Sequence, residues 1–173
     1  MKLAHALLAG AALAVSIPTV QAADLLYGSP LDPIYSSPLY DFEGLYAGIT
    51  GGGAFAGGGL YGTLGVVVGS NFAITDGIIA GIEFQGSTYW DGAFSSYDAL
   101  ALGRVGGFLS DNTLIYGALG AGFADGSPVY AFGAGLELAV TETISVRGEL
   151  QGLGEFGAGP SVGKATAGLL FRF

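Results

Sequence analysis

Apolar and polar residues alternate with a period of two in four separate segments, and this pattern limits the possible folds more than any other feature. The four segments are residues 78–90, 130–140, 144–150 and 164–173. In one of them, Ile144, Val146 and Leu150 alternate with Ser145, Arg147 and Glu149. Successive side chains of a strand point to opposite faces, so the pattern predicts β-strands with one apolar and one polar face.

Polar or glycine-rich breaks divide residues 44–173 into eight such segments. Three breaks are short, at 75–77, 110–113 and 141–143, and four are longer, at 55–59, 90–96, 124–128 and 154–161. We therefore expect eight strands, at 45–54, 60–73, 78–89, 97–109, 114–123, 129–140, 144–153 and 162–173. Glycine blurs the alternation most in the first and fourth of these.

The N-terminal 22 residues have the layout of a secretory signal peptide. Lys2 precedes an apolar run over residues 3–17, and small residues surround Ala22, so we expect cleavage after Ala22 or after Ala23. A permanent anchor is the alternative, but the run is short for a bilayer core of roughly 30 Å. Residues 23–43, which hold Pro30, Pro33 and Pro38, are interpreted as an extended leader.

Removal of the signal peptide also removes His5, the one histidine of a chain without cysteine. Histidine-based and cysteine-based catalysis and their zinc, copper or haem sites are thereby excluded. We expect no catalytic residues, no cofactor and no metal site, and therefore a non-enzymatic protein. The mature chain has four basic against 14 acidic residues, a formal charge of 4 − 14 = −10, so we expect no nucleic-acid partner.

All four basic residues of the mature chain fall on the polar series of a predicted strand, together with four acids. Arg104 joins this series if Leu100, Leu102 and Phe108 also point inward. The opposite orientation would place the arginine in lipid, which costs roughly 2 to 4 kcal/mol at mid-depth. The predicted interior charge network is Glu83, Asp98, Arg104, Glu137, Arg147, Glu149, Lys164 and Arg172.

The balance of these charges distinguishes two all-β architectures. A soluble sandwich would leave them in water, where nothing requires balance, whereas a membrane barrel has to pair them inside. We therefore predict an eight-stranded antiparallel up-and-down transmembrane β-barrel over residues 44–173, with the soluble sandwich as the alternative. A transmembrane helix in the uncharged segment 44–75 is a second alternative, weakened by eleven glycines at roughly 1 kcal/mol each.

Four aromatic residues are expected to form an interfacial girdle: Tyr89, Trp90, Phe94 and Tyr97.

Short motifs in order along the chain carry a family resemblance. They are Gly-Leu-Tyr-Ala-Gly at 44–48, Gly-Ile-Glu at 81–83, Gly-Arg-Val-Gly at 103–106, Gly-Ala-Gly-Leu-Glu at 133–137, Val-Arg-Gly-Glu at 146–149 and a terminal Phe-Arg-Phe. The chain resembles the alphaproteobacterial Omp25/Omp31-like outer-membrane proteins, which belong to the OmpA-like eight-stranded barrels. The resemblance implies that Leu169, Phe171 and Phe173 form the signal read by the barrel-assembly machinery. The short loops and glycine-rich body differ from the family, which weakens any transfer of its adhesin roles.

These observations predict an integral protein of a Gram-negative outer membrane with both termini in the periplasm. Its expected role is structural, in support of the cell envelope, with membrane lipid and lipopolysaccharide as partners. The alternative is a narrow pore for ions or small solutes, because Asp91, Asp125 and Glu155 in the outer loops would favour cations.

Overall fold

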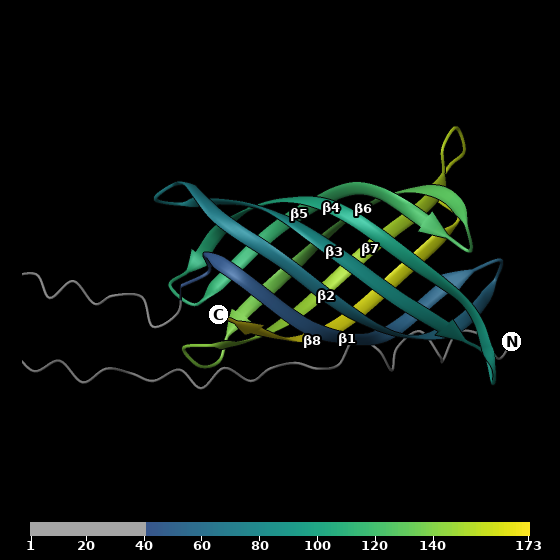
Figure 1. The fold of residues 1–173 in the computed structure, drawn as a ribbon, viewed down its shortest axis with the longest axis horizontal. Helices are drawn as coiled ribbons and strands as arrows, with labels where there is room; N and C mark the ends of the chain where they lie inside the picture. The colour runs from purple at the N-terminus through teal and green to yellow at the C-terminus, as the bar shows by residue number, and fades with distance from the viewer. Residues whose placement is uncertain (1–40) are drawn as a thin grey trace, which may run out of the picture. The chain divides into compact units, whose positions relative to one another are not determined.

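The computed structural model describes residues 41–173, which form eight antiparallel strands closed into a barrel (Figure 1). The strands are β1 (Gly44–Ala56), β2 (Gly59–Thr75), β3 (Ile78–Trp90), β4 (Phe94–Ser110), β5 (Thr113–Ala124), β6 (Ser127–Ala139), β7 (Ile144–Glu155) and β8 (Val162–Arg172). The predicted signal peptide, and the predicted leader up to residue 40, lie outside the described residues.

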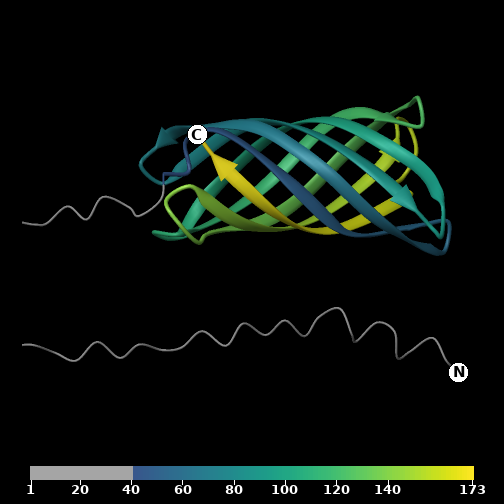
Figure 2. The ribbon, with the colours of Figure 1, turned by 60° about the horizontal axis from the view of Figure 1, so that its bottom comes forward.

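Each strand pairs with its neighbours in the sequence, and β8 returns to pair with β1 (Figure 2). The closing ladder runs from Tyr46 opposite Arg172 to Ala56 opposite Val162. Closure leaves no strand edge of the barrel unpaired, which stabilises an antiparallel sheet without disulfides. The predicted eight-stranded up-and-down barrel is confirmed.

The predicted breaks lie at the correct places, but all four of the longer ones are too long. β1 and β2 are joined by Gly57 and Gly58 alone, and β5 and β6 by Asp125 and Gly126 alone. All four residues have positive φ, at 58°, 83°, 50° and 83° respectively, as two-residue hairpin turns with twisted strands require. Similarly, β4 begins at Phe94 rather than at 97. The small residues beside these turns continue the ladder, although composition alone resembles a loop.

The uncharged segment 44–75 forms the β1–β2 hairpin. Its register extends from Gly44 opposite Asn71 to Ala56 opposite Gly59. From residue 41 onward, the structure contains no helix with the length and apolar character that crossing a membrane demands. The helical interpretation of this segment is therefore wrong.

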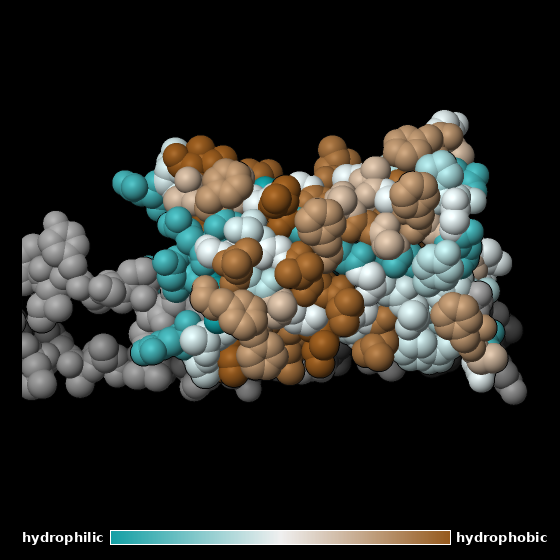
Figure 3. All heavy atoms as spheres, in the orientation of Figure 1, coloured by the Kyte–Doolittle hydropathy of each residue, from teal (hydrophilic) through white to brown (hydrophobic). Residues whose placement is uncertain are grey.

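The outer face of the barrel is apolar and the inner face carries the charges. Outward side chains such as Leu119 and Leu150 are 67% and 68% exposed, whereas Glu83 and Arg147 are 1% and 2% exposed. Figure 3 shows apolar residues across the middle of one side of the barrel and hydrophilic residues gathered at an end. A soluble sandwich has the opposite distribution, so that alternative is wrong as well.

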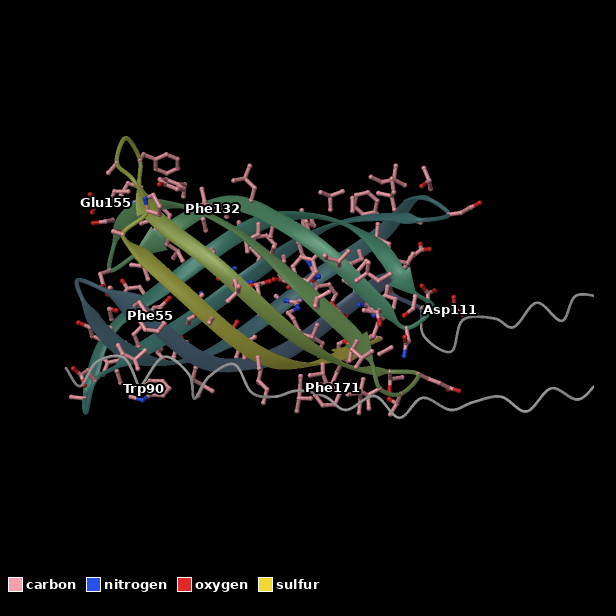
Figure 4. All side chains as sticks on the ribbon, turned by 180° about the vertical axis from the view of Figure 1, so that it is seen from behind. Phe55, Trp90, Asp111, Phe132, Glu155 and Phe171 are labelled. Atoms are coloured by element: carbon pink, nitrogen blue, oxygen red, sulfur yellow. The ribbon has the colours of Figure 1, made fainter. Side chains whose placement is uncertain are left out.

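The two ends of the barrel differ. The terminal end holds the start of β1, the end of β8, and the turns at 76–77, 111–112 and 140–143. The loop end holds the connections at 57–58, 91–93, 125–126 and 156–161. In Figure 4, Asp111 and Phe171 mark the terminal end, and Phe55, Trp90 and Glu155 mark the loop end.

Candidate functional site

All eight residues of the predicted interior network are buried inside the barrel, between 0% and 8% exposed. They do not form one network. Six of them lie in a group that we call the terminal cluster: Glu83, Arg104, Glu137, Arg147, Glu149 and Arg172. The remaining two, Asp98 and Lys164, form a separate pair nearer the loop end, which we call the loop pair. Each group contains equal numbers of acids and bases.

Two arginines and two glutamates form the centre of the terminal cluster. Arg104 Nη1 and Arg147 Nη1 lie 3.1 and 2.8 Å from Glu83 Oε2. The Nη2 atoms of the same arginines lie 3.4 and 3.6 Å from Glu137 Oε2. Each carboxylate therefore bridges two cations that come from β4 and β7, on different sides of the lumen. In a barrel interior shielded from water, such mutual pairing is what makes buried charge tolerable.

Hydrogen bonds extend the cluster toward β8 and the other glutamate. Arg172 Nη2 donates to Glu137 Oε1 at 3.1 Å, and Ser145 Oγ donates to the same oxygen at 2.8 Å. Gln85 Nε2 donates to Glu83 Oε1 at 2.7 Å and to Glu149 Oε1 at 2.9 Å, so this amide joins two carboxylates. The cluster is therefore continuous across the lumen.

Two tyrosines that were not predicted from the sequence complete the cluster. Tyr46 donates a hydrogen bond to Glu83 Oε2 at 2.5 Å, and Tyr116 donates one to Glu149 Oε2. The Arg104 Cζ lies 3.8 Å from the centroid of the Tyr116 ring and 5.4 Å from that of Tyr46. The rings therefore supply both a hydroxyl for an acid and a π face for a cation.

Glycines on the neighbouring strands make room for these rings. Tyr46 lies opposite Gly69, and Tyr116 lies opposite Gly135. A β-carbon at either glycine would collide with the ring of the opposite tyrosine. Close packing of ring on glycine thus holds each hydroxyl in position beside its glutamate, one strand further around the barrel.

An internal repeat in the sequence contains two parts of this arrangement, the glycine opposite each tyrosine and the glutamate beside it. Residues 69–86 and 135–152 align without a gap at an offset of 66, and seven of these eighteen positions are identical. The identical pairs are Gly69 and Gly135, Ala73 and Ala139, Thr75 and Thr141, Ile78 and Ile144, Glu83 and Glu149, Gln85 and Gln151, and Gly86 and Gly152. The β2–β3 hairpin and the β6–β7 hairpin are therefore related units, each beside a tyrosine-bearing strand.

The arginine lies on different strands in the two halves of the barrel, β1–β4 and β5–β8. Arg104 on β4 lies opposite Gly81 on β3, and Arg147 on β7 lies opposite Gly168 on β8. Gly81 and Arg147 are equivalent positions of the repeat. Each half thus places one arginine and one glycine at the same level of the barrel, and the two cations meet the shared glutamates from different directions.

The loop pair is a smaller site. Lys164 Nζ lies 3.2 Å from Asp98 Oδ2 and donates to Ser87 Oγ at 3.2 Å, and Tyr89 donates to the same Asp98 oxygen. Tyr89 is only 7% exposed, so its assignment to the aromatic girdle is wrong: its place in the inward series of β3 takes it inside. Trp90, Phe94 and Tyr97 are 40%, 69% and 47% exposed.

Apolar side chains fill the interior beside the loop pair. Leu100 and Leu102 point inward as expected, where they pack with Tyr116, Ala131 and Leu153. Phe108, which was expected to point inward as well, is not buried. It is 40% exposed at the terminal end, where its ring centroid lies 5.6 Å from that of Phe42.

The last leader residues close the terminal end. Phe42 is 2% exposed and packs with Ile79 and Leu114. Its carbonyl accepts hydrogen bonds from Arg172 Nη1 at 2.5 Å and Asn71 Nδ2 at 3.0 Å. Residues 41–43, which were predicted to belong to an extended leader, therefore form a plug in the barrel mouth.

The proposed assembly residues lie outside the interior. Leu169, Phe171 and Phe173 are 45%, 48% and 84% exposed on the outer series of β8 and its end. Among residues 41–173, no group of three or more acidic, histidine or cysteine side chains is arranged to hold a metal ion.

Comparison with known proteins identifies the fold. No protein-family model matches the sequence, and no curated protein sequence matches it either. A barrel from work on the de novo design of transmembrane β-barrels superposes with a TM-score of 0.51 at 16% identity, over 78% of this chain and 99% of that one. The fold is that of a transmembrane β-barrel.

Two further solved structures give a TM-score of 0.47 each. The outer-membrane protein Ail of Yersinia pestis is 15% identical, over 74% of this chain and 99% of that one. The designed barrel TMB2.3 is 17% identical, over 76% of this chain and 94% of that one. These likenesses assign no family, so membership of the Omp25/Omp31-like group stays a prediction.

Proposed function

We propose that this protein is a non-enzymatic structural barrel of the outer membrane whose closed interior supports the cell envelope without conducting. The observation that carries the proposal is the terminal cluster, which joins side chains from seven of the eight strands across the lumen. In strand order from β1 to β8, without β2, they are Tyr46, Glu83, Arg104, Tyr116, Glu137, Arg147 and Arg172. An eight-stranded barrel is just wide enough for side chains to fill.

A second closure lies between this cluster and the terminal end. Phe42 occupies the mouth, and Arg172 ties its carbonyl to the cluster, since the same guanidinium contacts Glu137. A solute that entered past Asp125 and Glu155 at the loop end would meet the loop pair, then the terminal cluster, then Phe42. The pore alternative requires all three to open.

The proposed orientation places the terminal end in the periplasm. In outer-membrane barrels the periplasmic turns are short and the external loops longer. Both ends have two-residue turns, but the longest connection, residues 156–161, lies at the loop end, and the longest at the terminal end is the four-residue turn 140–143. The signal peptide pattern and the apolar outer face fit this location. Membrane lipid and lipopolysaccharide are the proposed partners of the outer face, and the assembly machinery that of Phe173.

Single-channel recording of the refolded mature protein in a planar bilayer tests the proposal. We expect no steady conductance from the parent. Glu149→Ala removes the acceptor of Tyr116 and one of the two acceptors of Gln85, so current from this variant would identify the cluster as the barrier. Asp111→Asn, in an exposed turn at the terminal end, is the matched control and should stay silent.

Folding has to be verified for each variant before recording. A folded barrel migrates faster on a gel unheated than boiled, and all three proteins should show this difference. Steady conductance from the folded parent, altered in Glu149→Ala, would contradict the structural role and establish the pore.

A further inference from the structure

The loop end contains a cavity that the structural role does not use. Its volume is about 440 Å³, within the usual range for small-molecule sites. It extends from exposed residues at the rim, Asp125 and Glu155, to a buried floor that includes Asp98 and Tyr89. The cavity is thus a recess in the barrel mouth and lies on the far side of the loop pair from the terminal cluster.

Every charged side chain that lines this recess is acidic. Asp98, Asp125 and Glu155 line it, and no arginine or lysine does. Lys164 neutralises Asp98 from below, which leaves the two rim carboxylates without a cationic partner within 4 Å among the described residues. The four described basic residues all lie in the interior, so the recess attracts cations and repels anions.

The geometry of Asp125 fixes one rim carboxylate. The residue has φ of 50°, and its Oδ1 accepts a hydrogen bond from the Tyr97 backbone nitrogen at 3.1 Å. The amide nitrogen of Asp125 in turn donates to the Tyr97 carbonyl at 3.1 Å. This carboxylate is therefore held at the rim by its own turn and by β4, with Oδ2 left for a ligand.

The floor contains an acceptor that lacks a donor. Asp98 is 3% exposed, and its Oδ1 makes no hydrogen bond to any described residue, although Oδ2 binds both Lys164 and Tyr89. A buried acceptor without a hydrogen bond carries a desolvation penalty, and a donor that reaches it removes this penalty. The floor therefore favours a ligand that carries N–H groups.

The remaining lining distinguishes an organic cation from a metal ion. Tyr61 and Tyr89 belong to the inward series of β2 and β3 and present aromatic surface, and Val129 and Leu153 present aliphatic surface. No three acidic side chains in residues 41–173 are grouped closely enough to hold a metal ion. Separated carboxylates with apolar and aromatic surface between them suit ammonium groups joined by an alkyl chain.

We propose that the loop-end cavity binds a linear aliphatic di- or polyamine, with one ammonium group at Asp125 and Glu155 and the alkyl chain against Tyr61. A second amine group points toward the floor above Asp98. The site reaches the loop pair through Asp98 but uses no residue of the terminal cluster and does not use Phe42, so its occupancy does not depend on whether those two closures open.

Titration calorimetry with spermidine as the probe tests the site. The mature protein is placed in nanodiscs of phosphatidylcholine, which carries no net charge, so that the lipid does not compete for the amine. We expect saturable binding to the parent. Asp125→Asn keeps the hydrogen bond to Tyr97 and a residue type that tolerates positive φ, and it removes only the charge.

The rim variants should weaken binding by a factor typical of one exposed charge pair. Asp125→Asn and Glu155→Gln are each expected to raise the Kd roughly two- to fivefold. Asp91→Asn is the matched control, because Asp91 lies in the loop at 91–93 of the same end but does not line the cavity. Its Kd should equal that of the parent.

The contribution of the Tyr61 ring to binding is tested separately. Tyr61→Leu should weaken spermidine binding, whereas Tyr61→Phe, which retains the π face, should not. Magnesium chloride should compete poorly at a concentration equal to that of spermidine. Absence of saturable binding to the folded parent, an equal loss in Asp91→Asn and Asp125→Asn, or displacement by equimolar Mg²⁺ would each overturn the proposal in favour of a diffuse acidic surface.

Discussion

The ring of Tyr46 on β1 fills the space beside Gly69 on β2 in which a β-carbon would otherwise stand. This contact brings the tyrosine hydroxyl within 2.5 Å of Glu83 on β3. Because Tyr116 and Gly135 repeat the relationship on β5 and β6, the glycines act as sockets for the two rings of the terminal cluster.

Substitution of either socket should destabilise the barrel. Gly69→Ala and Gly135→Ala place a methyl group against a ring that is held by its glutamate, and forced overpacking of this kind costs about 1 to 3 kcal/mol. The measurement is urea unfolding in lipid vesicles. Gly148→Ala is the control, since a β-carbon there meets nothing within 4 Å. Equal losses in all three variants would contradict the socket role.

The strand number could be predicted from the polar and glycine-rich breaks, and the face of most charged residues from the local period of two. A period of two places Arg147 and Glu149 on the same face whatever the partners of β7 are. The positions of the hairpin turns could be predicted, but their lengths could not. Gly57 and Gly58 form a turn, while similar small residues beside them stay in the ladder.

The division of the charges into two groups could not be predicted, because it depends on register between strands. Asp98 meets Lys164 rather than an arginine only because of how β4 and β8 are positioned around the closed barrel. Tyr46 and Tyr116 were missed since a tyrosine in an alternating strand resembles any other apolar residue. Phe42 was missed because the leader has no period that would distinguish a buried side chain from an exposed one.

Glu137 should be the most sensitive acid of the terminal cluster, because it faces three arginines. Its Oε2 lies 3.4 Å from Arg104 and 3.6 Å from Arg147, and its Oε1 lies 3.1 Å from Arg172. Glu137→Gln leaves buried guanidinium groups without their counter-charge, and we expect a loss of about 3 to 5 kcal/mol in the free energy of unfolding.

The matched control is Glu142→Gln in the exposed turn at 140–143. Loss of an exposed charge should change stability by about 0.5 kcal/mol or less. Chemical denaturation of both variants under identical lipid conditions gives the comparison. A Glu137→Gln barrel as stable as Glu142→Gln would show that the cluster contributes little beyond filling the lumen.

Phe42 should contribute to barrel stability although it precedes β1. Phe42→Ala empties the space between Ile79 and Leu114, and burial of this kind is worth about 3 to 5 kcal/mol. Phe156→Ala, in the β7–β8 loop, removes a ring that is 62% exposed and has an edge contact with Tyr130. We expect a loss of about 1 kcal/mol there. Equal effects would mean that residues 41–43 do not stabilise the mouth.

Phe173 is expected to act in assembly and not in stability. Its side chain is 84% exposed, and its contribution to the ladder is a backbone hydrogen bond to the Leu45 carbonyl at 3.0 Å, which alanine retains. Phe173→Ala should therefore refold in detergent as the parent does, as judged by the gel shift between heated and unheated samples. In cells, the same substitution should reduce the amount of folded barrel in the outer-membrane fraction.

Phe55→Ala separates recognition of the terminal residue from a general loss of lipid-facing aromatic surface. Phe55 is 53% exposed on the outer series of β1 and lies far from the chain end. Its loss should leave insertion in cells unchanged. If Phe173→Ala and Phe55→Ala insert equally well, the terminal residue is not read during assembly. If Phe173→Ala also fails to refold in detergent, its effect in cells is one of stability, and the assembly role is again contradicted.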